Sequence, residues 1–396
     1  MKKTVRFAAL AVLLLHSAMA NAEWVGTWSA SPQPLKNSIT FTNQTVRQIV
    51  RVSIGGDSVR IKISNLFGTK PVHFDAIRVA QHQTLSTFKM GTDRGVTFGR
   101  DPSPTLNPGE ELWSDPISIH VQNGAELAVS MYFHDATIPY TFHSVSSENT
   151  YISTPGNFVF APAFLDHFTI TQSWYFITDI SVESTGSSIV AIGDSITDGV
   201  CSTLNSNTRW PDGLATRLFA VNRSNPRGVL NQGIGYNRVL LDQPDLNQPS
   251  ISAISRFEHD VLDQPGVRYV ILLEGINDIG MAAPDASPTD MANAIIQGHL
   301  QMITAAHARG LKIYGATLLP IGGSGMDVPG KRQMRDLVNA WIRTTAPYDA
   351  VVDFDAAVRD NTDPQKMIAG YDCGDHVHPN SVGYQAMANS LNLSLF

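Results

Sequence analysis

The sequence has few cysteines, little basic charge and no apolar run long enough to cross a membrane. Two of its 396 residues are cysteines, and 35 Asp and Glu outnumber 28 Lys and Arg, for a net charge of −7 at pH 7. The basic residues form no run, which argues against nucleic acid as a partner. An acidic chain also has no electrostatic attraction to an anionic membrane surface. We therefore expect neutral or cationic partners.

An apolar run of nine residues, Phe7–Leu15, lies near the N-terminus and is too short to span a bilayer. Three basic residues precede it, and the small residues Ala20-Asn21-Ala22 follow it. This is the pattern of a secretory signal peptide. We therefore expect residues 1–22 to be cleaved and the mature protein to be exported, either to the periplasm or into the medium. The residue after the cleavage site is Glu23 rather than a cysteine, so we expect no lipid anchor and no stable membrane anchor.

Motifs for phosphates, metals and repeats are missing too. Gly233-Ile234-Gly235 lacks the third glycine of a phosphate-binding loop. His376 and His378 lie two residues apart, which suits zinc only with a third ligand, and the sequence identifies none. There is no internal repeat and no low-complexity segment. We expect a protein that uses no metal and no cofactor.

Length and composition predict two globular domains behind the leader. A chain of 396 residues with 43% hydrophobic and 16% charged residues is neither disordered nor a coiled coil. We place the first domain at residues 23–185 and the second at residues 186–396. Between them, the small and polar stretch Ser181–Ser188 is expected to be the linker.

Strand signals fill residues 23–185, and no helical pattern of ten or more residues occurs there. The signals are β-branched or alternating runs between turn residues, and they cover Thr45–Ile54, Val59–Ile63, Leu127–Phe133 and Tyr140–Tyr151. Short strands of this kind predict an antiparallel sandwich or jelly roll. Such a domain either binds carbohydrate or has a structural role, because Trp24, Trp28 and Trp113 fit a core as well as a binding platform.

From Ile189 onward, strand and helix signals alternate. Strands are expected at Ile189–Ile192, Gly228–Asn231, Tyr269–Leu273, Leu311–Ala316 and Ala350–Phe354. Helices are expected at Arg209–Leu218, Ala292–Arg309, around Lys331–Thr344 and from Ser381, with Gly310 as the stop of the second. Five strands separated by helices predict an α/β fold with a doubly wound, parallel five-stranded sheet.

A serine, an aspartate and a histidine carry the predicted chemistry. Ser195 follows the first of these strands, and the carboxyl end of a parallel strand is where α/β sheets bind ligands. Asp375 and His378 are three residues apart and would face the same way on one helical turn. Asp375 could then hold the His378 ring while the ring takes a proton from Ser195. His376 would point elsewhere, and each piece taken alone also fits a helix cap or a turn.

Two further stretches offer groups that could stabilise an oxyanion. Asn277 follows the third strand and carries a side-chain N–H. Asn231–Asn237 follows the second strand and contains glycines that let a backbone N–H approach a substrate. One such donor contributes roughly 3–4 kcal/mol to catalysis where it has been removed.

The two cysteines lie close in sequence to these candidate residues. Cys201 is six residues after Ser195, and Cys373 is two residues before Asp375. A cysteine pair outside the cytoplasm is readily oxidised. If the two segments meet at an active site, the cysteines meet there too, so we expect a disulfide, with two buried free thiols as the alternative.

Together and in this order, the motifs resemble those of the SGNH/GDSL serine hydrolases, the GDSL esterase/lipase family. The blocks are Gly193–Asp198, Asn231–Asn237, Gly275–Asp278 and Asp375–Asn380, and the resemblance runs from Ile189 to about Met387. The chain looks in particular like exported bacterial members with a β-rich domain in front. The resemblance implies a flavodoxin-like SGNH hydrolase fold.

The resemblance also implies roles for individual residues. Ser195 would be the nucleophile, His378 the base and Asp375 its partner, with the Ser195 backbone, Asn277 and a backbone N–H of the second block as oxyanion donors. This sequence departs from the family pattern at Tyr236, where related sequences have glycine. The Cβ of tyrosine restricts its backbone, so the donor is expected at either Tyr236 or Gly235. The rival α/β-hydrolase fold needs a G-x-S-x-G elbow, which is missing around Ser195.

These observations predict an exported, metal-independent carboxylic ester hydrolase that works through an acyl-enzyme. Acylated polysaccharides, short-chain esters and lysophospholipids all fit the resemblance, and the β-rich domain favours polysaccharide esters. Two alternatives stay open: an acyltransferase that uses the same site, and a non-catalytic carbohydrate-binding or scaffold protein. The intact site residues argue against the second alternative. The oligomeric state is not predicted.

Overall fold

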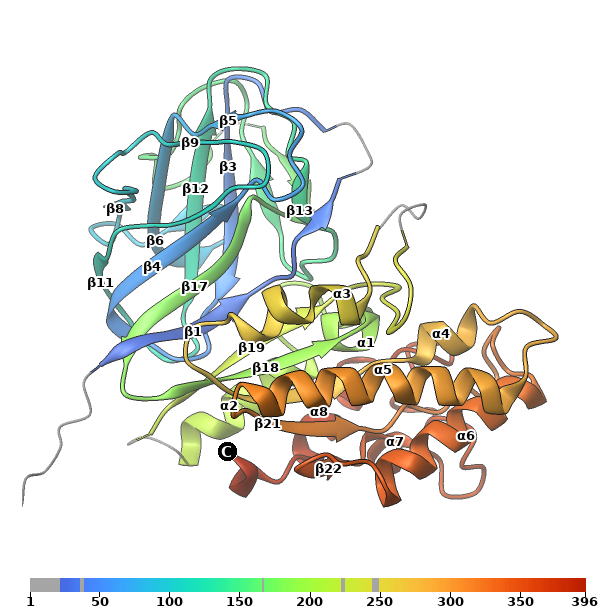
Figure 1. Ribbon diagram of the computed structural model, residues 1–396. Helices are drawn as coiled ribbons and strands as arrows, with labels where there is room; N and C mark the ends of the chain where they lie inside the picture. The colour runs from blue at the N-terminus through green and yellow to red at the C-terminus, as the bar shows by residue number, and fades with distance from the viewer. Residues whose placement is uncertain (1–21, 36–38, 166, 222–224, 244–248) are drawn as a thin grey trace, which may run out of the picture.

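The computed structural model describes residues 22–35, 39–165, 167–221, 225–243 and 249–396 (Figure 1). Up to Ser184 the described chain forms strands, and after it strands and helices alternate. Figure 1 shows the β-rich region above the α/β region, with β1 (Glu23–Ser29) along the boundary between them. The predicted leader, residues 1–22, lies outside the described residues except for Ala22.

Two antiparallel sheets make up most of the β-rich region. The first has the order β1, β17 (Ile177–Ser184), β4 (Gly56–Ser64), β10 (Glu111–Trp113), and β11 (Ile117–Val121) also pairs with β4. The second has the order β15 (Thr169–Thr171), β14 (Thr150–Ile152), β3 (Gln44–Arg51), β12 (Glu126–Phe133), β6 (Ala76–Thr84), β7 (Thr87–Phe88), and β8 (Arg94–Gly95) pairs with β6. Smaller sheets join β16 (Trp174–Tyr175), β13 (Thr141–His143) and β2 (Gln33–Pro34), and β5 (Val72–His73) with β9 (Thr105–Leu106).

Side chains that alternate along these strands build the core of the region. Val59, Ile61 and Ile63 of β4 are fully buried, as their alternation with polar residues predicts.

The predicted linker Ser181–Ser188 is wrong in extent, because β17 continues to Ser184 and the next strand begins at Ser187. Residues 181–184 belong to β17, which lies between β1 and β4, and Ser187 and Ser188 begin β18, so only two residues connect the regions.

A parallel five-stranded sheet forms the centre of the α/β region. Its order is β19 (Arg227–Gly233), β18 (Ser187–Gly193), β20 (Val267–Leu273), β21 (Lys312–Ala316), β22 (Ala350–Val352). The first strand in the chain, β18, therefore lies between the second and the third. The connections that leave its carboxyl end diverge from those of its neighbours, and a crevice opens at such a point.

Helices occupy both faces of this sheet and the loops at its carboxyl edge. Their bounds are α1 (Ser195–Asp198), α2 (Trp210–Val221), α3 (Ala253–Phe257), the π-helix η1 (Glu258–Leu262), α4 (Ile276–Gly280), α5 (Pro288–Ala308), α6 (Pro329–Thr344), α7 (Phe354–Val358), α8 (Ser381–Ser390) and the 3₁₀-helix η2 (Leu393–Leu395). Gly310 follows α5 with φ 70°, the left-handed backbone predicted for its C-terminal stop.

The two regions meet where β1 crosses β19. The approach is so close that a Cβ on Gly228 would lie 1.9 Å from the carbonyl oxygen of Gly26. Hydrogen bonds cross the same boundary, from the N–H of Gly26 to the carbonyl of Pro265 (2.9 Å) and from the N–H of Val229 to Ser53 Oγ (2.8 Å). Glycine at these positions is what lets the two backbones touch.

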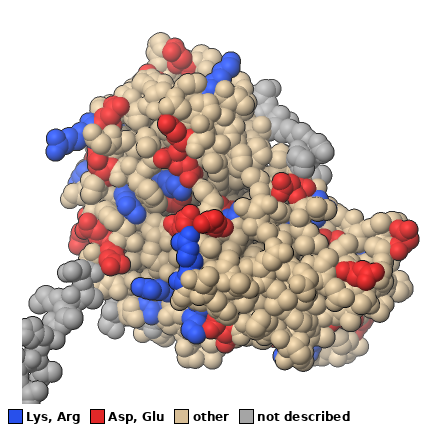
Figure 2. Space-filling view, in the orientation of Figure 1, with Lys and Arg blue, Asp and Glu red and all other residues tan. Residues whose placement is uncertain are grey.

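The surface carries mixed charge. On the face drawn in Figure 2, Lys and Arg of the β-rich region are interspersed with Asp and Glu, and the described residues there form no continuous basic patch. Much of the helical layer below is uncharged on this face. None of the helices in the described ranges has the length and apolarity that a membrane crossing requires.

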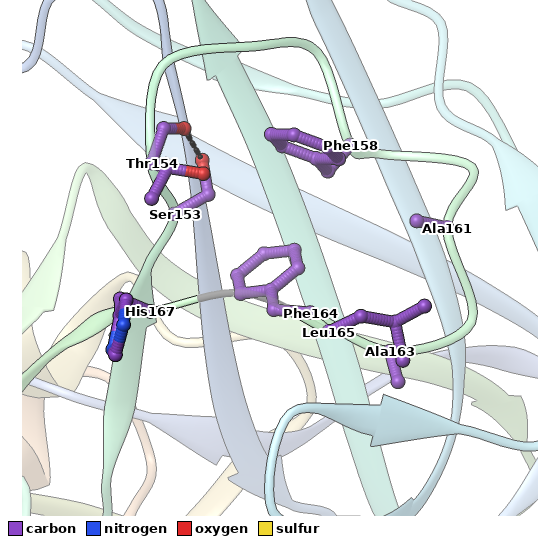
Figure 3. A pocket seen from close by; sticks show the side chains of 8 residues that line it. All are labelled: Ser153, Thr154, Phe158, Ala161, Ala163, Phe164, Leu165 and His167. Atoms are coloured by element: carbon purple, nitrogen blue, oxygen red, sulfur yellow. Dashed lines mark hydrogen bonds between the residues drawn. The ribbon is translucent and has the colours of Figure 1, made fainter.

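The β-rich region contains a small apolar cavity of about 220 Å³, lined by Phe158, Phe164 and Leu165 among others (Figure 3).

The three tryptophans considered as a sugar platform have other partners. Trp28 is buried, and the rings of Trp24 and Trp113 flank the guanidinium of Arg60 at 4.7 and 4.2 Å from its central carbon, Cζ. A carbohydrate-binding role for this region therefore stays a prediction.

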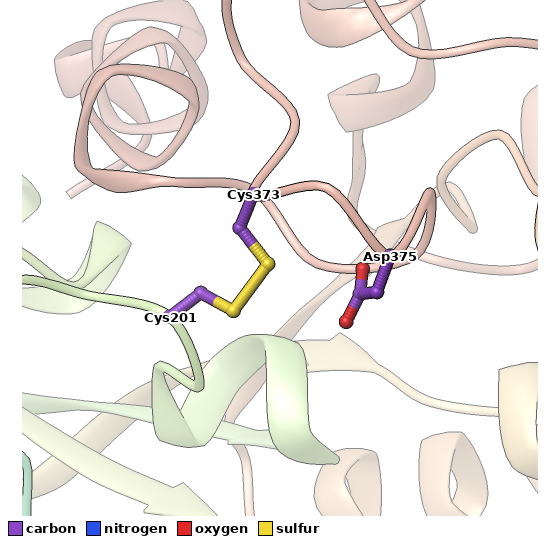
Figure 4. A group of neighbouring side chains, drawn as sticks. All are labelled: Cys201, Cys373 and Asp375. Atoms are coloured by element: carbon purple, nitrogen blue, oxygen red, sulfur yellow. A yellow bond between two sulfur atoms is a disulfide. The ribbon is translucent and has the colours of Figure 1, made fainter.

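Cys201 and Cys373 form a disulfide, as expected (Figure 4). It joins the loop after α1 to the loop before α8, across 172 residues of sequence. Constraining a loop of this length removes conformational freedom from the unfolded chain and so favours the folded state.

We predict that Gly228→Ala lowers the free energy of unfolding by about 1–3 kcal/mol, because the added methyl group forces β1 away from β19. Urea unfolding of the purified protein measures the change. The matched control is Gly330→Ala in the first turn of α6, where the added Cβ meets only Pro288 at 3.9 Å. That change should be neutral or stabilising by up to about 1 kcal/mol. Equal stability of both variants would contradict the close approach.

We also predict that the Cys201→Ser, Cys373→Ser double variant loses about 2–5 kcal/mol of unfolding free energy. The wild-type protein should show no reactive thiol when it is denatured without reductant. Two reactive thiols in that assay would rule out the disulfide.

Candidate active site

Ser195 follows the carboxyl end of β18, where the connections of the neighbouring strands diverge. Asp194 caps α1 by accepting a hydrogen bond from the N–H of Ile196 (2.9 Å). Gly193 has to be glycine, because a Cβ there would lie 2.1 Å from Thr197 Oγ1. Within the described chain the backbone N–H of Ser195 donates no hydrogen bond, so it is available to donate to a ligand. The local sequence thus places a serine with a free N–H at the sheet edge.

The segment before α8 brings a histidine to this serine. Ser195 Oγ lies 2.8 Å from His378 Nε2, and His378 Nδ1 lies 2.6 Å from Asp375 Oδ2. The predicted helical turn is wrong, because residues 375–378 are not helical. Asp375 Oδ1 instead accepts the backbone N–H groups of Val377 (2.9 Å) and His378 (2.8 Å), which is an Asx turn. The turn brings the same two side chains together by a different backbone path.

The hydrogen bonds at Asp375 determine which nitrogen of His378 is free to accept a proton. Burial alone would raise the pKa of Asp375, but the hydrogen bonds from the His378 ring and from two backbone N–H groups lower it below its ordinary value. An ionised carboxylate accepts the Nδ1 proton, which leaves the lone pair of Nε2 directed at Ser195 Oγ. His376 bonds to Asp372 instead, with its Nδ1 2.5 Å from Asp372 Oδ2, and so lies away from the serine, as expected.

The candidate oxyanion donors lie on the neighbouring loops. Asn277, at the start of α4, donates from Nδ2 to the carbonyl of Asn237 (2.8 Å), and its second N–H remains for a ligand. Tyr236 has φ 60°, in the left-handed region that glycine favours, and half of its surface is exposed. Its backbone therefore adopts the conformation that explains a glycine in related sequences. Among the described residues, the backbone N–H groups of Gly235 and Tyr236 donate to no acceptor. Both residues therefore remain candidates for the oxyanion donor of the second block.

Four buried ionisable groups surround the serine loop, and the sequence analysis assigned none of them a role. Burial raises the pKa of Asp194 to about 7 and that of Asp278 to about 6. Burial and the nearby charge of Asp194 raise the pKa of Glu274 well above its ordinary value. Arg256, 5% exposed, supplies the positive charge among them. No spacing in the sequence announces such a group, because its partners come from distant segments.

A histidine–aspartate pair that the sequence analysis did not predict connects α1 to the β-rich region. His143 of β13 lies with Nε2 3.0 Å from Asp198 Oδ1 and with Nδ1 2.9 Å from the carbonyl of Ser31. Both side chains are buried. Burial would lower the pKa of His143, but the charge of Asp198 raises it above its ordinary value. A protonated ring donates both hydrogen bonds. The C-terminal end of α1, the helix that begins at Ser195, is therefore connected to the β-rich region.

The geometry offers no evident metal site among the described residues. One group of three potential ligands lies close together, Cys201, Cys373 and Asp375, drawn in Figure 4. Its two sulfur atoms are bonded to each other, so neither is a thiolate ligand. His376 and His378 are each bonded to a different carboxylate.

Comparison with known proteins identifies the α/β region. Residues 191–386 match the family described as GDSL-like Lipase/Acylhydrolase. The chain is similar to a solved carbohydrate acetylesterase from Sinorhizobium meliloti, 16% identical over 52% of this chain and 95% of that one, TM-score 0.40. It is similar to a catalytic mutant of an acetylxylan esterase from Geobacillus stearothermophilus, 22% identical over 52% and 93%, TM-score 0.38. A GDSL-like lipase from Bacteroides thetaiotaomicron is 20% identical over 51% and 84%, TM-score 0.35.

No curated protein sequence matches the chain. The family match spans all four blocks that the sequence analysis singled out, from the strand before Ser195 to the helix after His378. Through this region the chain belongs to the GDSL-like lipase/acylhydrolase family, and it is a carboxylic ester hydrolase.

Proposed function

We propose that the chain is an exported serine esterase in which Ser195 is the nucleophile, His378 the general base and Asp375 the group that orients the base. The 2.8 Å hydrogen bond between Ser195 Oγ and His378 Nε2 supports this most directly. A serine hydroxyl is a weak nucleophile until a base lies within hydrogen-bond reach. Asp375 leaves that base one free nitrogen, on the side of the serine.

The reaction begins when Ser195 Oγ attacks the ester carbonyl while His378 takes the hydroxyl proton. The oxyanion that forms accepts hydrogen bonds from the N–H of Ser195, from Asn277 and from the N–H of Gly235 or Tyr236. One such donor contributes about 3–4 kcal/mol where it has been removed from other enzymes. His378 then gives its proton to the departing alcohol, and the acyl group stays on Ser195.

Water resolves the acyl-enzyme by the same steps in reverse, with His378 as its base. An alcohol in place of water would make the protein an acyltransferase. Partial exposure favours water: the side chains of His378 and Asp375 are 18% and 45% exposed, so solvent reaches the base. A non-catalytic scaffold would have no need for a serine, a histidine and a carboxylate in hydrogen-bond contact.

Acyl groups on carbohydrate are the substrate class we propose. Tyr236 stands in one of the donor loops with half of its surface exposed, and an exposed aromatic ring can stack on a sugar or on an aromatic acyl group. The excess of Asp and Glu over Lys and Arg favours neutral esters over acidic ones. Export is inferred from the leader pattern in residues 1–22.

We predict that Ser195→Ala lowers kcat by about 10⁴-fold or more and leaves the protein folded, because the change removes the nucleophile and only one side-chain hydrogen bond, the one to His378. A fluorophosphonate probe, read by peptide mass spectrometry, should label Ser195 in the wild type and nothing in the variant. Ser202→Ala is the control: this nearby hydroxyl bonds to Ser147 and not to the histidine, so the label should persist. Label on another residue would reject Ser195 as the nucleophile.

Activity should fall steeply as the pH is lowered from about 8 to 5, because a protonated His378 cannot accept the serine proton. Near-UV circular dichroism over the same pH range separates this fall from unfolding. Asp194 and Asp278 have raised pKa values in the folded protein, about 7 and about 6, so they bind protons more readily when folded. Their contribution therefore favours the folded state as the pH falls. A flat rate profile, measured beside near-UV circular dichroism, would speak against a histidine base.

A further inference from the structure

Arg256 touches the loops that supply the active site, although it bonds to none of Ser195, His378 and Asp375. It lies in α3, is 5% exposed, and its five N–H groups make six hydrogen-bond contacts, so two acceptors share one Nη1 proton. Nη2 donates to the carbonyl of Gly193 (3.0 Å), two residues before the serine. Nη1 donates to the carbonyl of Gln232 (2.8 Å), at the end of β19. One side chain thus holds the ends of two neighbouring strands.

The same guanidinium reaches the oxyanion donors through one residue. Nε and Nη2 both donate to Asn237 Oδ1, at 3.1 and 2.9 Å. The carbonyl of Asn237 in turn accepts the hydrogen bond from Asn277 Nδ2 (2.8 Å). Arg256 therefore orients Asn237, and Asn237 orients the amide of Asn277. Since Asn237 directly follows Tyr236, its position also determines where the second-block N–H groups point.

Arginine suits this position because its donors form a rigid planar fork. The fork bonds simultaneously to carbonyls, an amide oxygen, a hydroxyl and a carboxylate, each from a different direction. A lysine carries the same charge but presents three donors from one flexible atom, so it could keep only part of the set. The position thus depends on geometry as well as charge.

A buried cation also needs a counterion. The counterion of Arg256 is Asp260, which is connected by hydrogen bonds to the β-rich region. Arg256 Nη1 lies 2.8 Å from Asp260 Oδ2, and His259 Nδ1 lies 2.6 Å from Asp260 Oδ1. His259 Nε2 then reaches Glu111 Oε2 of β10 (2.8 Å), which Lys62 of β4 also contacts (2.9 Å). The π-helix η1 carries both His259 and Asp260, and irregular turns of this type recur at functional sites.

The charges along this chain persist at neutral pH. Burial opposes each charge, but mutual hydrogen bonds and ion pairing raise the pKa of His259 to about 10 and lower the pKa values of Glu111 and Asp260 to about 2. A second contact from the β-rich region reaches the arginine directly, since Ser31 Oγ accepts from Nη1 (2.9 Å). Two independent connections therefore join Arg256 to the β-rich region, one through Ser31 and one through Asp260, His259 and Glu111.

We infer that Arg256 is a positioning residue for the oxyanion donors, held in place by Ser31 and by the chain Glu111–His259–Asp260 from the β-rich region. The β-rich region then supports the active site itself, besides any role in binding carbohydrate. This inference rests on the proposed esterase function.

The test is Arg256→Lys in the full mature protein, assayed with p-nitrophenyl acetate. Displacing catalytic groups by about 1 Å costs up to about 100-fold in rate, so we expect kcat to fall 10- to 100-fold with KM changed less than about threefold. An alkyl boronic acid, which adds to the serine and places an oxygen among the oxyanion donors, should bind more weakly by the same factor as kcat/KM falls. A purely structural arginine would not move these two quantities together.

Arg335→Lys is the matched control. Arg335 is also a buried arginine of the α/β region, 2% exposed, with Asp355 and the carbonyl of Leu319 as partners and no hydrogen bond to the four blocks. It should lower the melting temperature and leave kcat and the boronate affinity within about twofold of wild type.

Glu111→Gln is the second variant, because it keeps the shape of a half-buried side chain and is expected to fold even if Arg256→Lys does not. It should lower kcat several-fold, from a change in the β-rich region alone. Wild-type kcat and boronate affinity in Glu111→Gln and in any folded Arg256→Lys protein would overturn the inference and leave the esterase function standing. A wild-type protein that neither hydrolyses the ester nor takes a fluorophosphonate label would overturn both.

Discussion

The hydrogen bond between Ser195 and His378 joins residues 183 positions apart, and most of the α/β region serves to close that distance. The parallel sheet brings the loop of Ser195 and those of its neighbours to one edge. Asp375 folds its own loop into an Asx turn and holds the ring, and the disulfide ties that loop to the one after α1. Each contact is local, but together they place the Ser195 hydroxyl within hydrogen-bond reach of an imidazole nitrogen.

Burying charge beside the serine has a cost that the structure offsets with one guanidinium. Asp194, Glu274 and Asp278 lie in the interior, and their raised pKa values express the penalty for ionising there. Arg256 balances part of this charge while its six hydrogen-bond contacts hold strand ends and Asn237 in one arrangement. A buried ion pair is weak evidence for stability, but it can enforce a single geometry. Here that geometry is the one that the proposed reaction needs.

Features with a local sequence signal could be predicted, and features built from distant segments could not. The run Ile189–Ile192 lies within β18, and Gly310 stops α5 in the left-handed conformation, because strand periodicity and helix caps act over a few residues. Asp375 and His378 were paired correctly but by the wrong turn, since an i, i+3 spacing fits both a helix and an Asx turn. The linker was placed too widely because small polar residues also fill a strand between two neighbours. Arg256 was missed altogether. Its partners lie at Ser31, Gly193 and Asn237, and no window along the sequence contains them.

In the proposed reaction an acyl group passes through Ser195, and this intermediate can be trapped. Enzyme mixed rapidly with p-nitrophenyl acetate and quenched in acid within milliseconds to seconds can be digested and mapped by mass spectrometry. We expect an initial burst of nitrophenol that approaches one equivalent of enzyme where deacylation is slow, with the acetyl group on the peptide that contains Ser195. Turnover with the acetyl group on a different residue, or with none trapped under conditions that show a burst, would contradict it.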